Sequence, residues 1–196
     1  EACRISAEAL RLAGNAVEPG VTTAEIDRIA EKYILSQGAV PNFKNYQGYP
    51  ATACISINNE VIHGIPSKKR VIKSGDIVSI DLGAKFDGYH GDNAATFACG
   101  DITDEAKRLI DTTRESLYEG IAAAVSGGRL GDIGHAIQQY VEQRGYSVVR
   151  KFVGHGVGTQ LHEAPEVPNF GTPGRGIRLM PGMTLAIEPM INQGGY

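Results

Sequence analysis

Apolar residues recur every three to four positions in several stretches of the chain, which is typical of helices with one buried face. In the first stretch the apolar stripe consists of Ile5, Ala9, Leu12 and Ala16. Thr22 and Asp132 stand near the starts of two later stretches, and Gly38 and Gly145 suit their ends. The pattern predicts helices over about 1–17, 23–37, 103–125 and 131–144.

Shorter apolar runs rich in β-branched residues and bounded by glycine or proline are typical of strands. They predict strands near 52–58, 76–84, 89–98, 148–153 and 183–190. The stretch from Pro165 to Gly182 is rich in proline and glycine and predicts an irregular connection. The expected fold class is α+β, with helices outside a curved, mostly antiparallel sheet.

A weak internal repeat relates the two halves of the chain. Gly75–Asp81 and Gly182–Glu188 each read as a glycine, an apolar strand and a carboxylate, and they are 107 positions apart. The helical stretches 20–38 and 128–145 follow the same offset after one gap. We therefore predict one domain over 1–196 with similar halves of about 1–102 and 103–196, and a metal site at the seam between them.

Composition narrows the classes of partner. The chain has 196 residues, 42% hydrophobic and 21% charged, and a net charge of −3 with scattered basic residues, so neither a nucleic acid nor an anionic membrane is an expected partner. No apolar run approaches the roughly 20 residues that span a bilayer. Cys3, Cys54 and Cys99 are widely spaced and odd in number, which favours reduced thiols and a cytoplasmic protein.

Two aspartates flank a predicted hairpin. Asp87-Gly88 is a strong two-residue turn signal, and it lies between Asp81 and Asp92. An even-length loop places both aspartates on one face of adjacent strands, opposed or diagonal, where their like charges repel. A divalent cation is the simplest remedy for that repulsion. The alternative is a pair of exposed aspartates beside a turn.

A further carboxylate and several histidines lie in glycine- or proline-rich surroundings. Glu188 follows an apolar strand, and a buried glutamate needs a partner, either a cation or an arginine. His155 lies between Gly154 and Gly156, and His162 follows in a segment that Pro165 prevents from being helical. His63 is a weaker candidate of the same kind, and each histidine taken alone could be structural.

Three carboxylates with one imidazole favour hard or borderline cations, namely Mn, Fe or Co, with Zn also possible. Carboxylates that can bridge also suggest two neighbouring ions, the arrangement that many hydrolases use to activate water.

The chain resembles the type I methionine aminopeptidases of the creatinase/prolidase superfamily, whose fold is called pita-bread, over essentially its whole length. The resemblance rests on the order and spacing of several segments: 45–50 (NYQGYP), 54–66 (CISINNEVIHGIP), 88–92 (GYHGD), 154–158 (GHGVG), 162–165 (HEAP) and 187–190 (IEPM). It implies metal-dependent removal of N-terminal methionine from nascent proteins by a monomeric enzyme.

The resemblance also implies roles for individual residues. The metal ligands would be Asp81, Asp92, His155 and Glu188, with Glu188 also accepting a proton. His162 would contact the scissile carbonyl, and His63 the new amine. The pocket for the methionine side chain would consist of Phe43, Tyr46, Tyr49, Cys54 and Leu161.

In one respect the chain departs from the family pattern. The family's last metal ligand is a second glutamate on a strand beyond residue 196, so we expect a fragment that lacks its C-terminal strands. With four of five ligands, such a fragment should hold at most one ion, although the family domain holds two. An aminopeptidase P or prolidase relative, and a binding protein of this fold with impaired catalysis, stay as alternatives.

Overall fold

A computed structural model describes residues 1–195 of the chain. The chain divides into two compact units. The first contains Glu1–Thr103 and Gly158–Leu161, and the second contains Asp104–Val157 and the described residues from 162 to 195. The main division therefore falls at residue 103, with one short segment of the later sequence belonging to the first unit. No helix within 1–195 combines the length and the apolar character needed to cross a bilayer.

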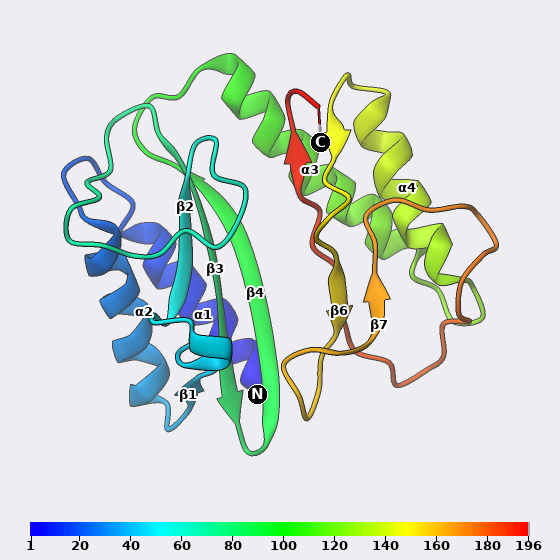
Figure 1. Ribbon diagram of the computed structural model, residues 1–196, viewed down its shortest axis with the longest axis horizontal. Helices are drawn as coiled ribbons and strands as arrows, with labels where there is room; N and C mark the ends of the chain where they lie inside the picture. Colours follow the sequence, from blue (N-terminus) through cyan, green and yellow to red (C-terminus); the bar gives the residue numbers. More distant parts are fainter. Residues whose placement is uncertain (196) are drawn as a thin grey trace. The chain divides into compact units, whose positions relative to one another are not determined.

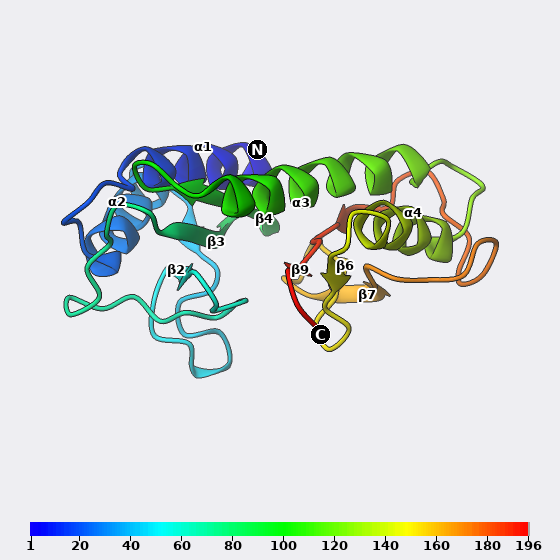
Figure 2. The ribbon, with the colours of Figure 1, turned by 90° about the horizontal axis from the view of Figure 1, so that it is seen from above.

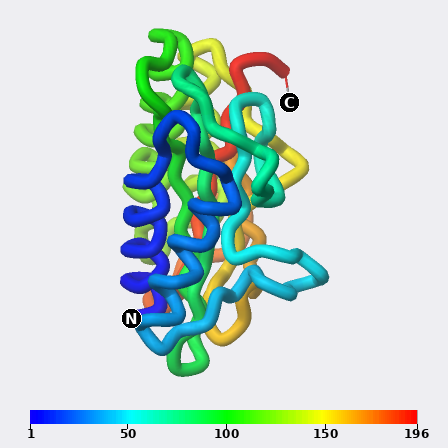
Figure 3. Tube along the Cα trace, turned by 90° about the vertical axis from the view of Figure 1, so that its left-hand side faces the viewer, coloured from blue at the N-terminus to red at the C-terminus, as the bar shows by residue number. Residues whose placement is uncertain are grey.

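The first unit packs two helices against an antiparallel sheet (Figure 1). Its elements are α1 (Ala2–Asn15), α2 (Thr23–Ser36), β1 (Val40–Pro41), the 3₁₀ turn η1 (Tyr46–Gly48), β2 (Ala53–Ile57), β3 (Ile77–Phe86) and β4 (Tyr89–Ala98). The long strand β3 is central: it pairs with β1 and β2 along one side and with β4 along the other. Figure 3 shows α1 and α2, both blue, side by side.

The two faces of β3 differ because its side chains alternate. Val78, Ile80, Leu82 and Ala84 are fully buried and belong to the core cluster that α1 and α2 complete. On β4, Asn93 points to the same face, where its Oδ1 accepts a hydrogen bond from Ser6 of α1 at 2.6 Å. Figure 2 shows both helices on one side of the sheet. Asp81 and its same-face neighbours therefore project away from the helices.

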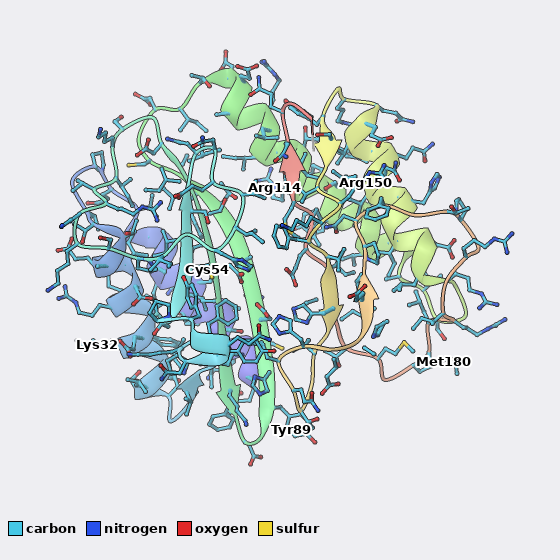
Figure 4. The ribbon with its side chains drawn as sticks, viewed as in Figure 1. Lys32, Cys54, Tyr89, Arg114, Arg150 and Met180 are labelled. Carbon is cyan, nitrogen blue, oxygen red and sulfur yellow. The ribbon has the colours of Figure 1, made fainter. Side chains whose placement is uncertain are left out.

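The β3–β4 hairpin has the turn that the sequence predicts. Phe86 pairs with Tyr89, so Asp87 and Gly88 form a two-residue loop. Their φ angles are 49° and 82°, and positive values at both positions match the type I′ turn that favours aspartate followed by glycine. Tyr89 lies at the exposed end of this hairpin (Figure 4).

The second unit also begins with two packed helices, followed by short strands. Its elements are α3 (Asp104–Ala123), α4 (Leu130–Glu142), β5 (Ser147–Val148), β6 (Gly154–Gly156), β7 (Glu163–Val167), β8 (Leu185–Ala186) and β9 (Ile191–Asn192). Strands β5 and β9 form one sheet, and β7, β6 and β8 form another in that order. The core contains Ile133, Ile137 and Val141 of α4, packed with Val148 and Val167.

Backbone pairings in the two units recur at the 107-residue offset. The register of β1 on β3 joins Val40 to Lys85, and that of β5 on β9 joins Ser147 to Asn192. Two isolated bridges follow the same rule: Thr22 pairs with Val71, and Arg129 pairs with Arg178. The second helix of each unit also begins in the same way. The residue just before the helix donates its backbone N–H to an acidic side chain three positions later: Thr22 to Glu25, and Arg129 to Asp132. These matches support the proposal of a duplicated half.

The helices lie where the sequence predicts them, with ends shifted by one or two residues, but the later strands do not. The predicted strand 148–153 is reduced to β5, and the predicted strand 183–190 is reduced to β8. Strand β7 was missed because Pro165 argues against a strand. It is tolerated there because β7 is an edge strand with a register shift between its pairs Glu166–His155 and Glu163–Gly156. The described strands form three sheets rather than one, and every pairing is antiparallel.

Candidate active site

The paired aspartates of the first unit lie as predicted, on adjacent antiparallel strands and on one face. Asp81 of β3 is the partner of Ala94, and Asp92 of β4 is the partner of Gly83, two positions further along β3. The aspartates are therefore diagonal neighbours, a relationship that brings Cβ atoms to within roughly 7–8 Å. Cys54 of β2 is the direct partner of Asp81 on its other side. Figure 4 places Cys54 on β2.

Most of the residues predicted to bind the methionine side chain lie together in the first unit. Phe43, Cys54 and Leu161 form a buried cluster with exposed fractions of 9%, 6% and 3%, and Tyr49 packs against it. Leu161 comes from the short segment Gly158–Leu161, and a backbone hydrogen bond of 2.8 Å from His90 N to Gly158 O ties that segment to β4. The cluster is apolar, aromatic at its edge and contains a thiol.

Hydrogen bonds and burial keep the polar groups of this cluster neutral. The single hydrogen of the Tyr49 hydroxyl is shared between two carbonyl oxygens, of Ala53 at 3.0 Å and Gly64 at 3.1 Å. Burial raises the pKa of the Tyr49 hydroxyl, and the bonded Cys54 raises it further. Burial also raises the pKa of the Cys54 thiol to about 12, although the hydrogen bond with Tyr49 lowers this pKa in part. The cluster is therefore uncharged at neutral pH.

Tyr46 and His63 lie outside this buried cluster. Tyr46 opens the 3₁₀ turn and is 36% exposed. His63 is exposed and has a φ of 62°, a left-handed conformation that is uncommon for a residue with a Cβ. The following residue anchors the loop: Gly64 N–H donates to the Ser56 hydroxyl at 3.1 Å, and Gly64 O accepts from Ile55 N at 2.8 Å.

In the second unit, the structure brings together His155 and Glu188. His155 lies on β6 and is 9% exposed, whereas Glu188 follows β8 by two residues and its side chain is 31% exposed. His155 Nε2 is 3.1 Å from Glu188 Oε1. Glycine at position 154 permits this approach, because a Cβ there would lie 2.2 Å from Ala186 O.

The chemistry of this pair fits a divalent cation. His155 Nδ1 is 2.9 Å from Gly156 O, and a carbonyl can only accept, so Nδ1 carries the hydrogen. In the neutral form of this imidazole, the Nε2 lone pair faces Glu188 Oε1, an oxygen that is buried without a hydrogen-bond partner among the described residues. Two electron-pair donors at this separation suit a metal ion, and the carbonyl of Gly156 is the usual kind of outer partner for a metal-binding histidine.

The four predicted ligands are divided evenly between the units, with Asp81 and Asp92 in the first and His155 and Glu188 in the second. Within either unit considered alone, the described residues gather no group of three or more potential ligands among His, Cys, Asp and Glu.

His162 lies beside His155 in the second unit. The ring centroids are 4.2 Å apart with an interplanar angle of 61°, an edge-on contact. His155 is buried, whereas His162 is exposed.

Sequence reasoning missed Asn169, which is fully buried and donates from Nδ2 to Glu188 O at 2.6 Å. Its sequence context, Pro168-Asn169-Phe170, reads only as a turn. No local signal could have linked it to a residue 19 positions away.

A buried histidine beside a glutamate, two further aspartates on one strand face and a buried apolar cluster are residue types that a metal-dependent hydrolase needs. The comparisons agree: the model of "Metallopeptidase family M24" matches residues 1–196, and the chain belongs to this family.

Within that family, the similar proteins are methionine aminopeptidases. The chain is 56% identical to the methionine aminopeptidase of Clostridium acetobutylicum over 196 residues, which is 100% of this chain and 78% of that protein. It is 55% identical to methionine aminopeptidase 1 of Bacillus subtilis, covering 91% of this chain and 71% of that protein. The particular group to which the chain belongs is therefore the methionine aminopeptidases.

Solved structures give the same result. The methionine aminopeptidase of Thermotoga maritima has a TM-score of 0.96 and 45% identity, covering 98% of this chain and 78% of that one. A prolidase from Pyrococcus furiosus has a lower TM-score of 0.83 and 25% identity, covering 99% of this chain and 56% of that one. The fold is the pita-bread fold, as predicted, and the prolidase alternative is the more distant one.

Proposed function

We propose that this chain removes the N-terminal methionine from nascent proteins by metal-dependent hydrolysis. The observation that carries the proposal is the 3.1 Å separation of His155 Nε2 from Glu188 Oε1, a buried oxygen without a hydrogen-bond partner among the described residues, in a chain that is 56% identical to a methionine aminopeptidase. A buried carboxylate oxygen that faces an imidazole nitrogen without a hydrogen bond is costly for a structural site and appropriate for a metal site.

The proposed ligands are Asp81, Asp92, His155 and Glu188. Three carboxylates and one neutral imidazole suit Co, Mn, Fe or Zn. A divalent ion held by them would supply the Lewis acidity that makes water nucleophilic near neutral pH. Because the family resemblance implies two ions held by five ligands, and these residues supply four, we propose that a polypeptide of these 196 residues holds one ion tightly.

The protein's own residues would then move the proton and stabilise charge. The Glu188 carboxylate would accept a proton from the attacking water. His162, exposed beside buried His155, donates a hydrogen bond to the oxygen of the scissile carbonyl as negative charge develops. His63, in the loop anchored by Gly64, contacts the released amine.

The buried cluster of the first unit would bind the methionine side chain. Phe43, Cys54 and Leu161 with Tyr49 supply aromatic edges and a sulfur, which interact well with a thioether. Tyr46, more exposed, would cover the entrance.

The proposed setting is the cytoplasm, and the proposed working form is a monomer that binds neither nucleic acid nor membrane. Support comes from the free thiols of Cys3, Cys54 and Cys99 and from the net charge of −3.

Peptide cleavage tests the proposal directly. We expect a Met-Ala-Ser peptide to be cleaved in the presence of Mn or Co, and Leu-Ala-Ser and Ala-Pro-Ser peptides to be cleaved far more slowly. Chelation with EDTA should abolish turnover, and added metal should restore it. Equal rates for the Met and Leu peptides would contradict the pocket, and preference for the proline peptide would favour the prolidase alternative.

A metal titration distinguishes an enzyme from a binding protein of the same fold. Calorimetry with Mn should give one tight ion per chain, and His155→Ala should weaken its binding more than about 100-fold, beyond the range known for outer partners of a site. Two equally tight ions would contradict the expected stoichiometry, and no binding would favour a metal-free binding protein.

A further inference from the structure

The backbone at Glu188 has little support from regular secondary structure. Strand β8 ends at Ala186, and β9 begins at Ile191. Between them, the peptide group that joins Glu188 to Pro189 has no N–H, because proline lacks one. Its carbonyl oxygen is therefore the only atom through which this peptide group can be held by a hydrogen bond.

That single atom is bound by Asn169. Nδ2 of Asn169 donates to Glu188 O at 2.6 Å, and the amide orientation is fixed because a carbonyl cannot donate in return. Asn169 Oδ1 faces away and is buried with no hydrogen-bond partner among residues 1–195. A fully buried amide with one unsatisfied oxygen is a poor choice for stability alone.

Asn169 is itself held by a rigid support. Asn169 follows β7 in a loop that packs closely on α4. The contact is so close that a Cβ at Gly134 of α4 would lie 2.3 Å from Phe170 O and 2.6 Å from Pro168 O of this loop. Gly171 N–H of the same loop donates to Gln138 Oε1 of α4 at 3.3 Å. Besides this packing, two side-chain hydrogen bonds hold the loop: Gln138 ties it to α4, and Asn169 ties it to Glu188.

We propose that Asn169 is a positioning residue: by holding the Glu188 carbonyl, it fixes the direction in which the Glu188 carboxylate meets His155 Nε2. Rotation of the Glu188–Pro189 peptide group would swing the Glu188 side chain, and loss of the Asn169 bond permits that rotation. Residues that orient metal ligands without touching the metal change metal affinity or activity by 10–100-fold. The inference rests on the proposed role of Glu188 as a metal ligand.

The decisive variant is Asn169→Leu, in which the side chain keeps its branched shape but loses both polar atoms. We expect Mn to bind about 10–100-fold more weakly by calorimetry. The metal-free melting temperature should stay unchanged or rise, because the unsatisfied oxygen is removed as well. With the Met-Ala-Ser peptide, kcat should fall while KM stays within about twofold, since the side-chain pocket is unaffected. Asn169→Ala serves the same purpose if the leucine does not fit.

Two further variants separate the explanations. Gln138→Leu removes the other attachment of the same loop and should leave Mn affinity within about twofold of wild type, whereas Glu188→Gln should weaken it strongly. If Glu188→Gln weakens binding and neither Asn169 variant does, the positioning role is wrong and the proposed function stands. If Glu188→Gln itself leaves the affinity unchanged, Glu188 is not a ligand, and both proposals fall. Equal losses in Gln138→Leu and Asn169→Leu would assign the effect to the loop as a whole and overturn the specific role of Asn169.

Discussion

Asp81 and Asp92 lie diagonally on one face of the β3–β4 hairpin, because Asp92 is the partner of Gly83 and side chains two positions apart on a strand share a face. The opposite face of the same strands is the apolar core against α1 and α2. Two acidic side chains are thus held near each other by a register that the core fixes.

Neutralising one of these aspartates should affect the metal-free and metal-bound forms in opposite directions. In Asp92→Asn, loss of the like-charge pair should leave the metal-free form as stable as wild type, or more stable by up to about 1 kcal/mol. The stabilisation that added Mn gives should largely disappear. Thermal melts with and without Mn measure both effects. Asp87→Asn is the matched control: it makes the same change in the turn of the same hairpin, where asparagine also accepts the positive φ of 49°. Equal losses of metal stabilisation in both variants would contradict the role of Asp92.

A methyl group at position 154 should disturb the metal site of the second unit. In Gly154→Ala the new Cβ would lie 2.2 Å from Ala186 O, a backbone atom that can yield only if β6 and β8 separate. We expect a loss of about 1–3 kcal/mol in unfolding free energy and weaker Mn binding, since β6 carries His155 and β8 leads to Glu188. Gly194→Ala is the control, because a Cβ there meets nothing within 4 Å. If Gly154→Ala binds Mn as tightly as wild type, the distance between β6 and β8 does not determine the metal affinity.

The three cysteines should differ in their reaction with iodoacetamide. Cys3 is exposed, whereas Cys54 and Cys99 are buried. Burial raises the pKa of Cys54 to about 12 and also raises that of Cys99, so little thiolate forms at pH 8. Mass spectrometry of the native protein should show fast labelling of Cys3 only, and labelling of all three after unfolding in guanidinium. Rapid native labelling of Cys54 would mean that the cluster with Phe43 and Leu161 is open.

Asp27 should make the first unit less stable as the pH rises. Burial raises the pKa of its carboxyl group, and the N–H groups of Ala53 and Thr52, which donate to Oδ1, lower it only in part. The native state therefore keeps this proton above the pH at which the unfolded chain loses it, near 3.9, and the stabilisation is lost as the pH rises through the raised value. Asp27→Asn cannot ionise, so its stability relative to wild type should increase across that window. Urea unfolding between pH 3 and 7 measures this difference.

Asp132 should affect stability with the opposite pH dependence, because its pKa is lowered and not raised. The N–H groups of Gly174 and Arg129 donate to its carboxylate and lower its pKa. The stabilisation that the Asp132 carboxylate gives the folded state is present above the ordinary aspartate pKa and is lost as the pH falls through the lowered pKa. Asp132→Asn should therefore lose stability relative to wild type as the pH rises. If both variants changed in the same direction, the assigned causes of the two pKa shifts would be wrong.

The sequence by itself determined the features that depend on neighbouring residues. The helices were predictable because their apolar spacing, capping residues and terminal glycines are local signals. The hairpin was predictable because Asp87-Gly88 favours one turn type, and the shared face of Asp81 and Asp92 followed from the two-residue period of strands. The motifs around His155 and Glu188 also indicated the family before any geometry was available.

Only the tertiary structure decided the features that join distant parts of one unit. Strand β7 is invisible in a sequence that contains Pro165, because what allows it is its edge position beside β6. Leu161 reaches Phe43 and Cys54, and Asn169 reaches Glu188, through contacts that leave no periodic pattern. The physical reason is that propensity and periodicity act over a few residues, whereas burial and hydrogen bonding depend on which surfaces the folded chain brings together.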